Sequence, residues 1–280
     1  MDSVPKLPIG EWVERMVEVL GQHKGILFDP IAIIISGMVT YFTEVLAAIP
    51  SVILILLFGA LAWVFGGRSS MFFTLLGLFL IANLGYWDET VETLGLVIAS
   101  ALLSIAVGIP AGIACARSDT FTKLVMPLLD LMQTMPAFVY LIPSIFFFGL
   151  GEVPGVIASV IFALPPIVRF TNLGIRQVPP ELAEAADAFG SSRWQKLMKV
   201  QLPLAKTTIM AGVNQCIMLA LSMVVIAAMI GAKGLGADVY RAVSQVDIGK
   251  GFEAGLSIVI IAIVLDRISQ HAKQKERKAL

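Results

Sequence analysis

The sequence predicts an all-α polytopic membrane protein with about seven spans, preceded by interfacial helices. Of the 280 residues, 58% are hydrophobic and only 14% are charged, and the mean hydropathy is +0.88. Several apolar runs reach about 20 residues, the length that an α-helix needs to cross the hydrocarbon core of a bilayer. A charged stretch, 179–203, separates two of the long apolar runs. This composition excludes an ordinary soluble domain.

The first segment, 1–48, is expected to lie at the membrane interface. Residues 10–22 place apolar side chains on one helix face and charged side chains on the other, which is typical of an interfacial amphipathic helix. The stretch 26–48 is apolar but is interrupted by Asp29, Pro30 and Glu44. It fits either a second interfacial helix or a marginal span, and the interruptions favour the interface.

Spans are expected at 50–66, 70–86, 91–115, 126–150, 153–175, 204–230 and 252–269. The first two form an accessory region, 49–86, and the others belong to a core, 87–270, which a basic tail, 271–280, follows. Along the 91–115 span a small residue recurs at every fourth position, which lets another membrane helix approach closely. The residues of this packing face are Ser100, Ser104, Gly108, Gly112 and Ala116.

The sequence offers no catalytic, redox or metal-binding constellation. Cys115 and Cys216 stand singly in apolar runs, and the two histidines lie at opposite ends of the chain. The glycine-rich run 231–236 does not fit the phosphate-binding P-loop pattern, so it predicts a turn at the outer end of a span. The chain contains no Walker A motif.

The basic residues predict the orientation in the membrane. If the C-terminal tail is cytoplasmic, alternation of the spans puts most lysines and arginines on that side and the acidic loops on the other. The N-terminus is then outside, and the stretch 179–203 is cytoplasmic. The tail residues Lys273, Lys275, Arg277 and Lys278 either only fix this topology or also bind anionic membrane lipid and so help to sense ionic strength.

The stretch 179–203 predicts two short helices joined at a glycine. Pro179 and Pro180 end the preceding span and start the first helix, which Gly190 ends as a left-handed cap. Ser192 and Gln195 predict a capping box for the second helix, which Pro203 is expected to close. A narrow apolar stripe on the first helix lies opposite its acidic residues, and consists of Leu182, Ala185, Ala186 and Phe189.

The spacing within this stretch resembles the EAA loop of ABC importer permeases, whose pattern is EAA-x3-G-x9-I-x-LP. The matching residues are Glu184, Ala185, Ala186, Gly190, Val200, Leu202 and Pro203, and the one departure is the valine in place of isoleucine. The alternative is an ordinary amphipathic hairpin on the membrane surface, which the complete spacing disfavours. The resemblance implies a type I ABC importer transmembrane fold, with 87–270 as its core and this loop as the docking point of an ATPase.

Three longer segments, 129–151, 165–179 and 218–236, resemble the permeases of glycine betaine/proline betaine importers. That family implies a translocation subunit of the bacterial cytoplasmic membrane rather than an enzyme. Its expected partners are a second permease copy, two cytoplasmic subunits that bind ATP and magnesium, and a separate extracellular solute-binding protein, with no nucleic acid. The implied substrates are quaternary ammonium osmoprotectants such as glycine betaine, carnitine or choline.

Two other functions stay open at this point. A permease for another small solute, such as methionine, would share the EAA loop. An ion-coupled secondary transporter would share broken spans with polar faces, but it would have no use for an EAA loop.

The 126–150 span carries the expected translocation path. Pro127, Pro136 and Pro143 interrupt it, and polar side chains at membrane depth are functional candidates. Asp130 either belongs to the path or meets water near the cytoplasmic end. A quaternary ammonium group has no N–H to donate, so aromatic faces and carbonyls suit it. The candidates are Asp130, Gln133, Thr134, Ala137, Phe138, Val139 and Tyr140, with Asn214 and Gln215 from the 204–230 span.

Overall fold

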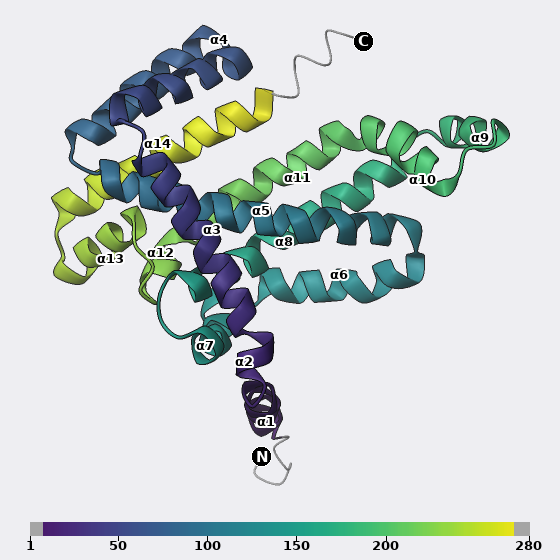
Figure 1. The fold of residues 1–280 in the computed structure, drawn as a ribbon, viewed down its shortest axis with the longest axis horizontal. Helices are drawn as coiled ribbons and strands as arrows, with labels where there is room; N and C mark the ends of the chain where they lie inside the picture. Colours follow the sequence, from purple (N-terminus) through teal and green to yellow (C-terminus); the bar gives the residue numbers. More distant parts are fainter. Residues whose placement is uncertain (1–7, 272–280) are drawn as a thin grey trace, which may run out of the picture.

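The computed structural model describes residues 8–271, which form α-helices and connecting turns without a strand in that range (Figure 1). The helices before the 97° bend are α1 (Ile9–Gly21), α2 (Lys24–Leu27), α3 (Asp29–Ala47), α4 (Ser51–Asn83), α5 (Trp87–Arg117) and α6 (Asp119–Thr134). Those after it are α7 (Ala137–Phe148), α8 (Glu152–Arg176), α9 (Pro180–Ala188), α10 (Arg193–Lys196), the π-helical η1 (Leu197–Gln201), α11 (Leu202–Ser222), α12 (Val224–Ala228), α13 (Leu235–Gln245) and α14 (Ile248–His271).

Within the described residues, six helical stretches are long and apolar enough to cross a membrane, and the bent pair α6–α7 makes a seventh. The six are α3, α4, α5, α8, the stretch Arg193–Ala228 and α14. This confirms the expected all-α membrane fold with about seven spans. The set differs from the expectation at α3, and it counts as one helix, α4, the two accessory spans expected at 50–66 and 70–86.

α4 is a helical hairpin rather than one straight rod. Gly67 breaks the helix with a φ of +79°, and the two arms, 51–66 and 68–83, match the two accessory spans expected there. The arms touch because Gly59 has no side chain: a Cβ on Gly59 would lie 2.5 Å from Leu75 Cδ2. At the turn, a Cβ on Gly66 would lie 3.7 Å from the Arg267 carbonyl oxygen, so the hairpin tip lies beside the last turns of α14.

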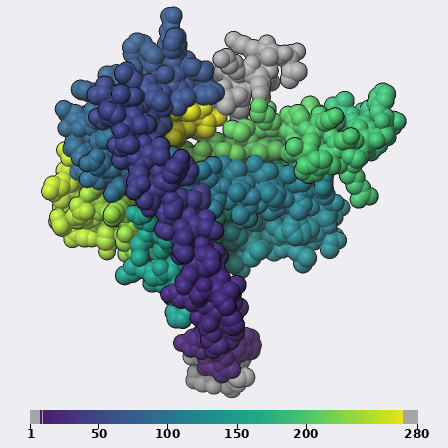
Figure 2. Space-filling model, viewed as in Figure 1, coloured from purple at the N-terminus to yellow at the C-terminus, as the bar shows by residue number. Residues whose placement is uncertain are grey.

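α3 has the length and composition of a span, whereas an interfacial helix was favoured for 26–48. Asp29 and Pro30 do not interrupt it. Both lie in its first turn, where a carboxylate and a proline favour the start of a helix, so only Glu44 is a charge inside the apolar run. α3 runs across α5 on the surface of the bundle (Figures 1 and 2). The two helices touch where Thr43 fills the space that a side chain on Gly95 would need.

α1 confirms the helix expected over 10–22, and its apolar side chains Trp12, Val13 and Met16 are exposed. The arm α1–α3 is joined to the end of α7 by aromatic contacts. The rings of Phe28 and Phe147 stack with centroids 4.1 Å apart. Figure 2 shows α1 extending beyond the main body of the molecule. The interfacial position of α1 stays a prediction.

The core of the molecule is α8, packed between α5 and α11. The small-residue face of α5 lies against α8, as expected. Ser100 and Ser104 are fully buried, Gly108 faces Ile167, and a Cβ on Gly112 would lie 2.5 Å from the Thr171 Cβ. Each serine hydroxyl donates a 2.8 Å hydrogen bond to a carbonyl one turn earlier, so burial leaves neither unpaired. Both cysteines are buried and free, and each packs within an apolar cluster.

The expected 126–150 span is two helices at an angle of 97°. Pro136 has no N–H to continue α6, and it forces Met135 into an extended conformation with φ −69° and ψ 137°. Another helix, α13, was not expected. It starts after Gly234, which has a φ of +98°, and its buried residues Leu235 and Ala242 lie two turns apart, a spacing that could have predicted it.

Candidate functional site

The helix α9 ends at Gly190 in the geometry expected from the sequence. Gly190 has a φ of +75°, its N–H donates to the Asp187 carbonyl at 2.9 Å, and the Ser191 N–H donates to the Ala186 carbonyl at 3.0 Å. These two bonds make a Schellman cap, which satisfies carbonyls that the helix leaves free. The local sequence therefore fixes both the length of α9 and the direction in which the chain leaves it.

The second half of the loop folds back and is tied to α9. Ser192 and Gln195 form the expected capping box. The Lys196 ammonium lies 2.8 and 2.7 Å from the two carboxylate oxygens of Asp187, which joins α10 to α9. The expectation that Pro203 closes this helix is wrong. α10, η1 and α11 are continuous, because Pro203 lies in the first turn of α11, just after a π-turn that interrupts the α-helical hydrogen bonding.

The residues of the EAA pattern divide into buried and exposed sets. Ala186 is buried, and Leu202 packs on a cluster of α8, η1 and α11 residues that includes Leu197. Glu184, Ala185, Gly190 and Pro203 are exposed, and Val200 is partly buried. The buried members hold the loop to the bundle, and the exposed members present its surface.

The outer face of α9 is apolar and exposed. Leu182 is 45% exposed and Phe189 is 91% exposed, and Trp194 of α10 adds a second exposed ring. This loop projects at one end of the molecule (Figures 1 and 2). Exposed apolar side chains rimmed by charges mark a surface that binds another protein.

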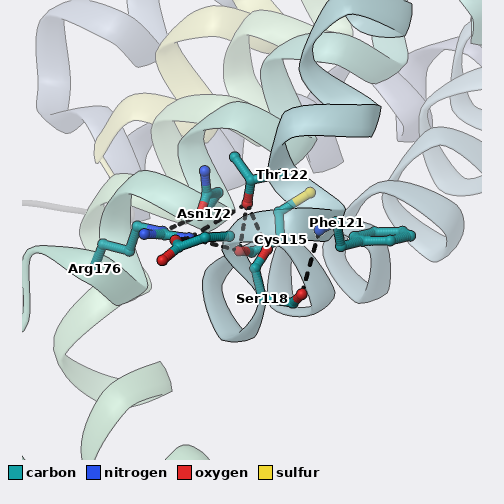
Figure 3. Close-up of polar contacts among 7 residues, drawn as sticks. Cys115, Ser118, Phe121, Thr122, Asn172 and Arg176 are labelled. Carbon is teal, nitrogen blue, oxygen red and sulfur yellow. Dashed lines mark hydrogen bonds and ion pairs between the residues drawn. The ribbon is translucent and has the colours of Figure 1, made fainter.

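The end of α8 is anchored just before this loop. The Arg176 guanidinium donates to the Asn172 side-chain oxygen at 2.8 Å, to the Cys115 carbonyl at 2.9 Å and to the Thr122 hydroxyl at 3.3 Å (Figure 3). It also lies 2.6 Å from the Asp119 carboxylate. One side chain of α8 therefore contacts the last turn of α5 and the first turn of α6.

The structure brings two path candidates together through a residue that was not among them. Arg169 of α8 lies 2.5 Å from the Asp130 carboxylate and donates to the Gln133 side-chain oxygen at 3.2 Å. Sequence reasoning assigned Arg169 only to topology, although a charged residue near an apolar span is itself a signal of a polar partner. Asp130 and Gln133 thus form one polar contact between α6 and α8.

The other candidates lie elsewhere. Thr134, Phe138 and Val139 are exposed around the bend, and Ala137 is partly buried. The Tyr140 hydroxyl is buried and has no hydrogen-bond partner among the described residues. Asn214 faces α14, where its amide donates to the Asp266 carboxylate at 2.9 Å and its oxygen accepts from Ser269, and Gln215 is exposed. The structure does not join Asn214 to the Asp130 group.

The family described as the inner membrane component of binding-protein-dependent transport systems matches residues 108–278. The chain belongs to this family. Its permease core therefore contains α8, α9, α11 and α14, and the loop around α9 lies at the centre of the matched region. The chain is accordingly a translocation component and not a catalytic subunit.

Similar permeases cover almost the whole chain. The glycine betaine transport system permease protein OpuAB of Bacillus subtilis is 54% identical over 277 residues, 99% of this chain and 98% of that protein. The glycine betaine/carnitine transport permease protein GbuB of Listeria monocytogenes is 52% identical over 282 residues, 99% of both chains. The glycine betaine/proline betaine permease ProW of Escherichia coli is 45% identical over 271 residues, 97% of this chain and 77% of that protein.

Solved structures confirm the fold of this permease. An inward-facing structure of the MetNI methionine ABC transporter matches with a TM-score of 0.59 at 20% identity, over 69% of this chain and 95% of the matched chain. The permease thus has the type I ABC importer fold that the EAA spacing implied.

Proposed function

We propose that this permease is the membrane-spanning subunit of an ATP-driven importer for glycine betaine or a related quaternary ammonium osmoprotectant. The observation that carries the proposal is the exposed apolar face of α9, presented by a loop with the EAA spacing. Support for the substrate comes from the permeases of glycine betaine systems that are 45–54% identical over nearly the whole chain. A permease for methionine is the weaker candidate, because the likeness to MetNI at 20% identity supports only the fold.

The proposed assembly contains two copies of the permease, two cytoplasmic subunits that bind ATP and magnesium, and an extracellular solute-binding protein. In this assembly each ATPase binds α9 in a groove on its own surface. The side chains that fill this groove are those of Leu182, Ala185 and Phe189. ATP binding closes the ATPases, and the motion passes through α9 and α8 to the spans. The polar and aromatic residues around the α6–α7 bend border the path of the substrate.

The proposed orientation puts the α9 loop, the tip of the α4 hairpin and the C-terminus in the cytoplasm. The N-terminus outside, as expected from the sequence, requires α3 to lie at the interface; an α3 that crosses the membrane puts the N-terminus in the cytoplasm. The described structure supports a shared side for two basic groups, since the hairpin tip with Arg68 lies beside Arg267 near the end of α14. The basic residues Lys273, Lys275, Arg277 and Lys278 lie outside the described residues. Their binding to anionic lipid is proposed from the sequence alone.

The test uses the permease in vesicles together with its co-expressed partners. Wild type is expected to capture an ATPase and to accumulate labelled glycine betaine when ATP is supplied. Glu184→Lys combined with Ala185→Asp puts charge into the apolar face of α9, so capture of the ATPase and uptake should both fall. Ala188→Asp is the matched control, because Ala188 is exposed on α9 away from the apolar stripe.

Equal ATPase capture by the double variant and by wild type would contradict the coupling role of α9. Capture without any betaine uptake by wild type would instead refute the substrate and leave the coupling role in place. Uptake of methionine in place of betaine would favour the second candidate.

A further inference from the structure

α6 is held to the bundle by one small apolar cluster. Leu129 is its one buried residue and packs with Cys115 of α5 and Val168 of α8, while Val125, Met126 and Met132 of α6 are only partly buried against this cluster. The contact between α5 and α8 is different in kind, because Gly108 and Gly112 bring these two helices so close that no side chain fits between them. α5 and α8 therefore form a rigid pair, and α6 is attached to that pair as a separate element.

Each end of α6 is connected to the neighbouring helix through a residue in an extended conformation. Ser118, between α5 and α6, is extended, with φ −141° and ψ 114°, and Met135 is extended at the other end. Such residues at the ends of elements absorb rotation without breaking helical hydrogen bonds. The position of α6 is therefore set by its side-chain contacts more than by its connections.

Two arginines of α8 supply the polar contacts that hold α6. Arg169 binds Asp130 and Gln133 near the end of α6, and Arg176, two helical turns further along α8, binds Thr122 and Asp119 at its start. Since α6 and α8 are antiparallel, these contacts hold α6 at two points along its length (Figure 1). The bend and the other path candidates of this segment, from Thr134 on, follow directly after the Arg169 contact.

The contacts that Arg176 makes differ in how strongly they hold α6. The Asp119 side chain is 79% exposed, so its ion pair is screened by water and contributes little. The Cys115 carbonyl lies in the last turn of α5, where a cation is favoured, and it also accepts a 2.6 Å hydrogen bond from the Thr122 hydroxyl. This shared carbonyl joins α5, α6 and α8 at one point.

Arg176 is also the last residue of α8, and only residues 177–179 separate it from α9. We propose that Arg176 is a positioning residue that makes α6, and with it the bend before α7, move together with α8 when α9 is displaced. The proposal rests on the proposed role of α9 as the ATPase lever. It gives the Arg176 guanidinium a role in coupling ATP hydrolysis to transport rather than in contacting substrate.

Coupling is measured as ATP hydrolysed per glycine betaine taken up, with the complete complex in vesicles. Arg176→Gln removes the charge and most of the donors, and this ratio is expected to rise roughly 2- to 30-fold, the range for residues that carry coupling. Arg176→Lys keeps one contact and should restore part of the coupling. Asp119→Asn is the matched control, because it removes only the exposed ion pair and should leave the ratio near that of wild type.

A distance measurement separates positioning from a merely structural role. Spin labels are placed at Leu124→Cys on α6, which is 71% exposed, and at Leu173→Cys on α8, in a Cys115→Ala, Cys216→Ala background that keeps the carbonyl of residue 115. Labelled chains are diluted with unlabelled copies, so that only distances within one chain are read. In wild type the distance should be the same with and without trapped ATP. In Arg176→Gln it should change between the two states.

A wild-type distance that changes on trapping ATP would overturn the proposal, as would an Arg176→Gln complex with unchanged coupling and an unchanged distance. If Arg176→Gln fails to assemble, Thr122→Val removes the hydroxyl from the shared carbonyl while keeping the side-chain shape, and it should raise the ratio in the same direction. A wild-type complex that binds its ATPase but takes up no betaine would refute the substrate, while the distance measurement would still decide the role of Arg176.

Discussion

Gly190 is the residue on which the geometry of the EAA loop depends most directly. A Cβ at this position would meet no atom within 4 Å, so only the positive φ of +75° restricts substitution. An L-residue in this conformation costs about 1–2 kcal/mol, and asparagine is among the residues that tolerate it best. The restriction is therefore one of backbone conformation and not of space.

We predict that Gly190→Val leaves the permease inserted but weakens its binding to the ATPase roughly 5- to 30-fold, which is the conformational cost expressed as affinity. Titration of the ATPase onto membranes containing each variant measures the effect. Gly190→Asn is the matched control and should bind almost as well as wild type. If valine and asparagine bind equally well, the cap does not set the geometry of the docking surface.

Arg169 and Arg176 show what a single charged side chain does in this molecule. Their hydrogen-bond partners on α5 and α6 are 36 to 61 positions away in the sequence. A positive charge near the end of a span indicates how the protein is oriented in the membrane. From the sequence, the two arginines indicated only this orientation and not their partners on other helices. The structure adds that both guanidinium groups join helices.

At the scale of the element, α6 and α7 form the part of the core that departs most from a simple span. The 97° bend exposes Val139 and the side chains around it, while Leu141 of α7 is buried. The buried Tyr140 hydroxyl, which has no hydrogen-bond partner in the part of the chain that the structure describes, lies in the same segment. These features favour the bend as the border of the translocation path.

We predict that single cysteines at Gln133, Ala137 and Val139 react with small cationic thiol reagents, in a background without Cys115 and Cys216. The pattern should change on trapping ATP, because the path opens to opposite sides in the two states. Leu141→Cys is the internal control and should stay unreactive, since Leu141 is 3% exposed. If the three path positions are protected in both states, the bent pair is only scaffold.

At the scale of the whole molecule, the charged ends of the bundle support the proposed orientation. The end opposite α9 carries a hollow of about 350 Å³ lined by Glu89, Glu92, Lys233, Asp238 and Arg241. The end beside α9 carries a hollow of about 420 Å³ lined by Arg117, Arg193 and Lys196. The mixed charge at one end and the basic charge at the other follow the distribution expected for a cytoplasmic α9 loop.

We predict that an impermeant thiol reagent labels Lys233→Cys in intact cells or right-side-out vesicles. Trp194→Cys, which is exposed on α10, should react only after the membrane is opened. Both variants use the same cysteine-free background, and total labelling after detergent treatment controls for expression. The reverse labelling pattern would contradict a cytoplasmic α9 loop.

The sequence alone predicted the membrane class, most of the spans, the packing face of α5 and the caps of α9 and α10. These features depend on the length of apolar runs and on hydrogen bonds between residues a few positions apart, which a linear pattern contains. The expectation that Asp29 and Pro30 interrupt the 26–48 helix was wrong for a related reason. Both residues disfavour the interior of a helix but favour its first turn, so their effect depended on where α3 begins.

Only the tertiary structure decided how the path residues are arranged. Pro136 predicted a break in the helix but not the 97° bend, because a proline interrupts the helical hydrogen bonds and does not fix the direction in which the chain continues. The pairing of Arg169 with Asp130 spans 39 positions, and the contact between Arg176 and the Cys115 carbonyl spans 61. Such contacts arise from how α5, α6 and α8 pack on one another, and the close approach at Gly108 and Gly112 sets that packing.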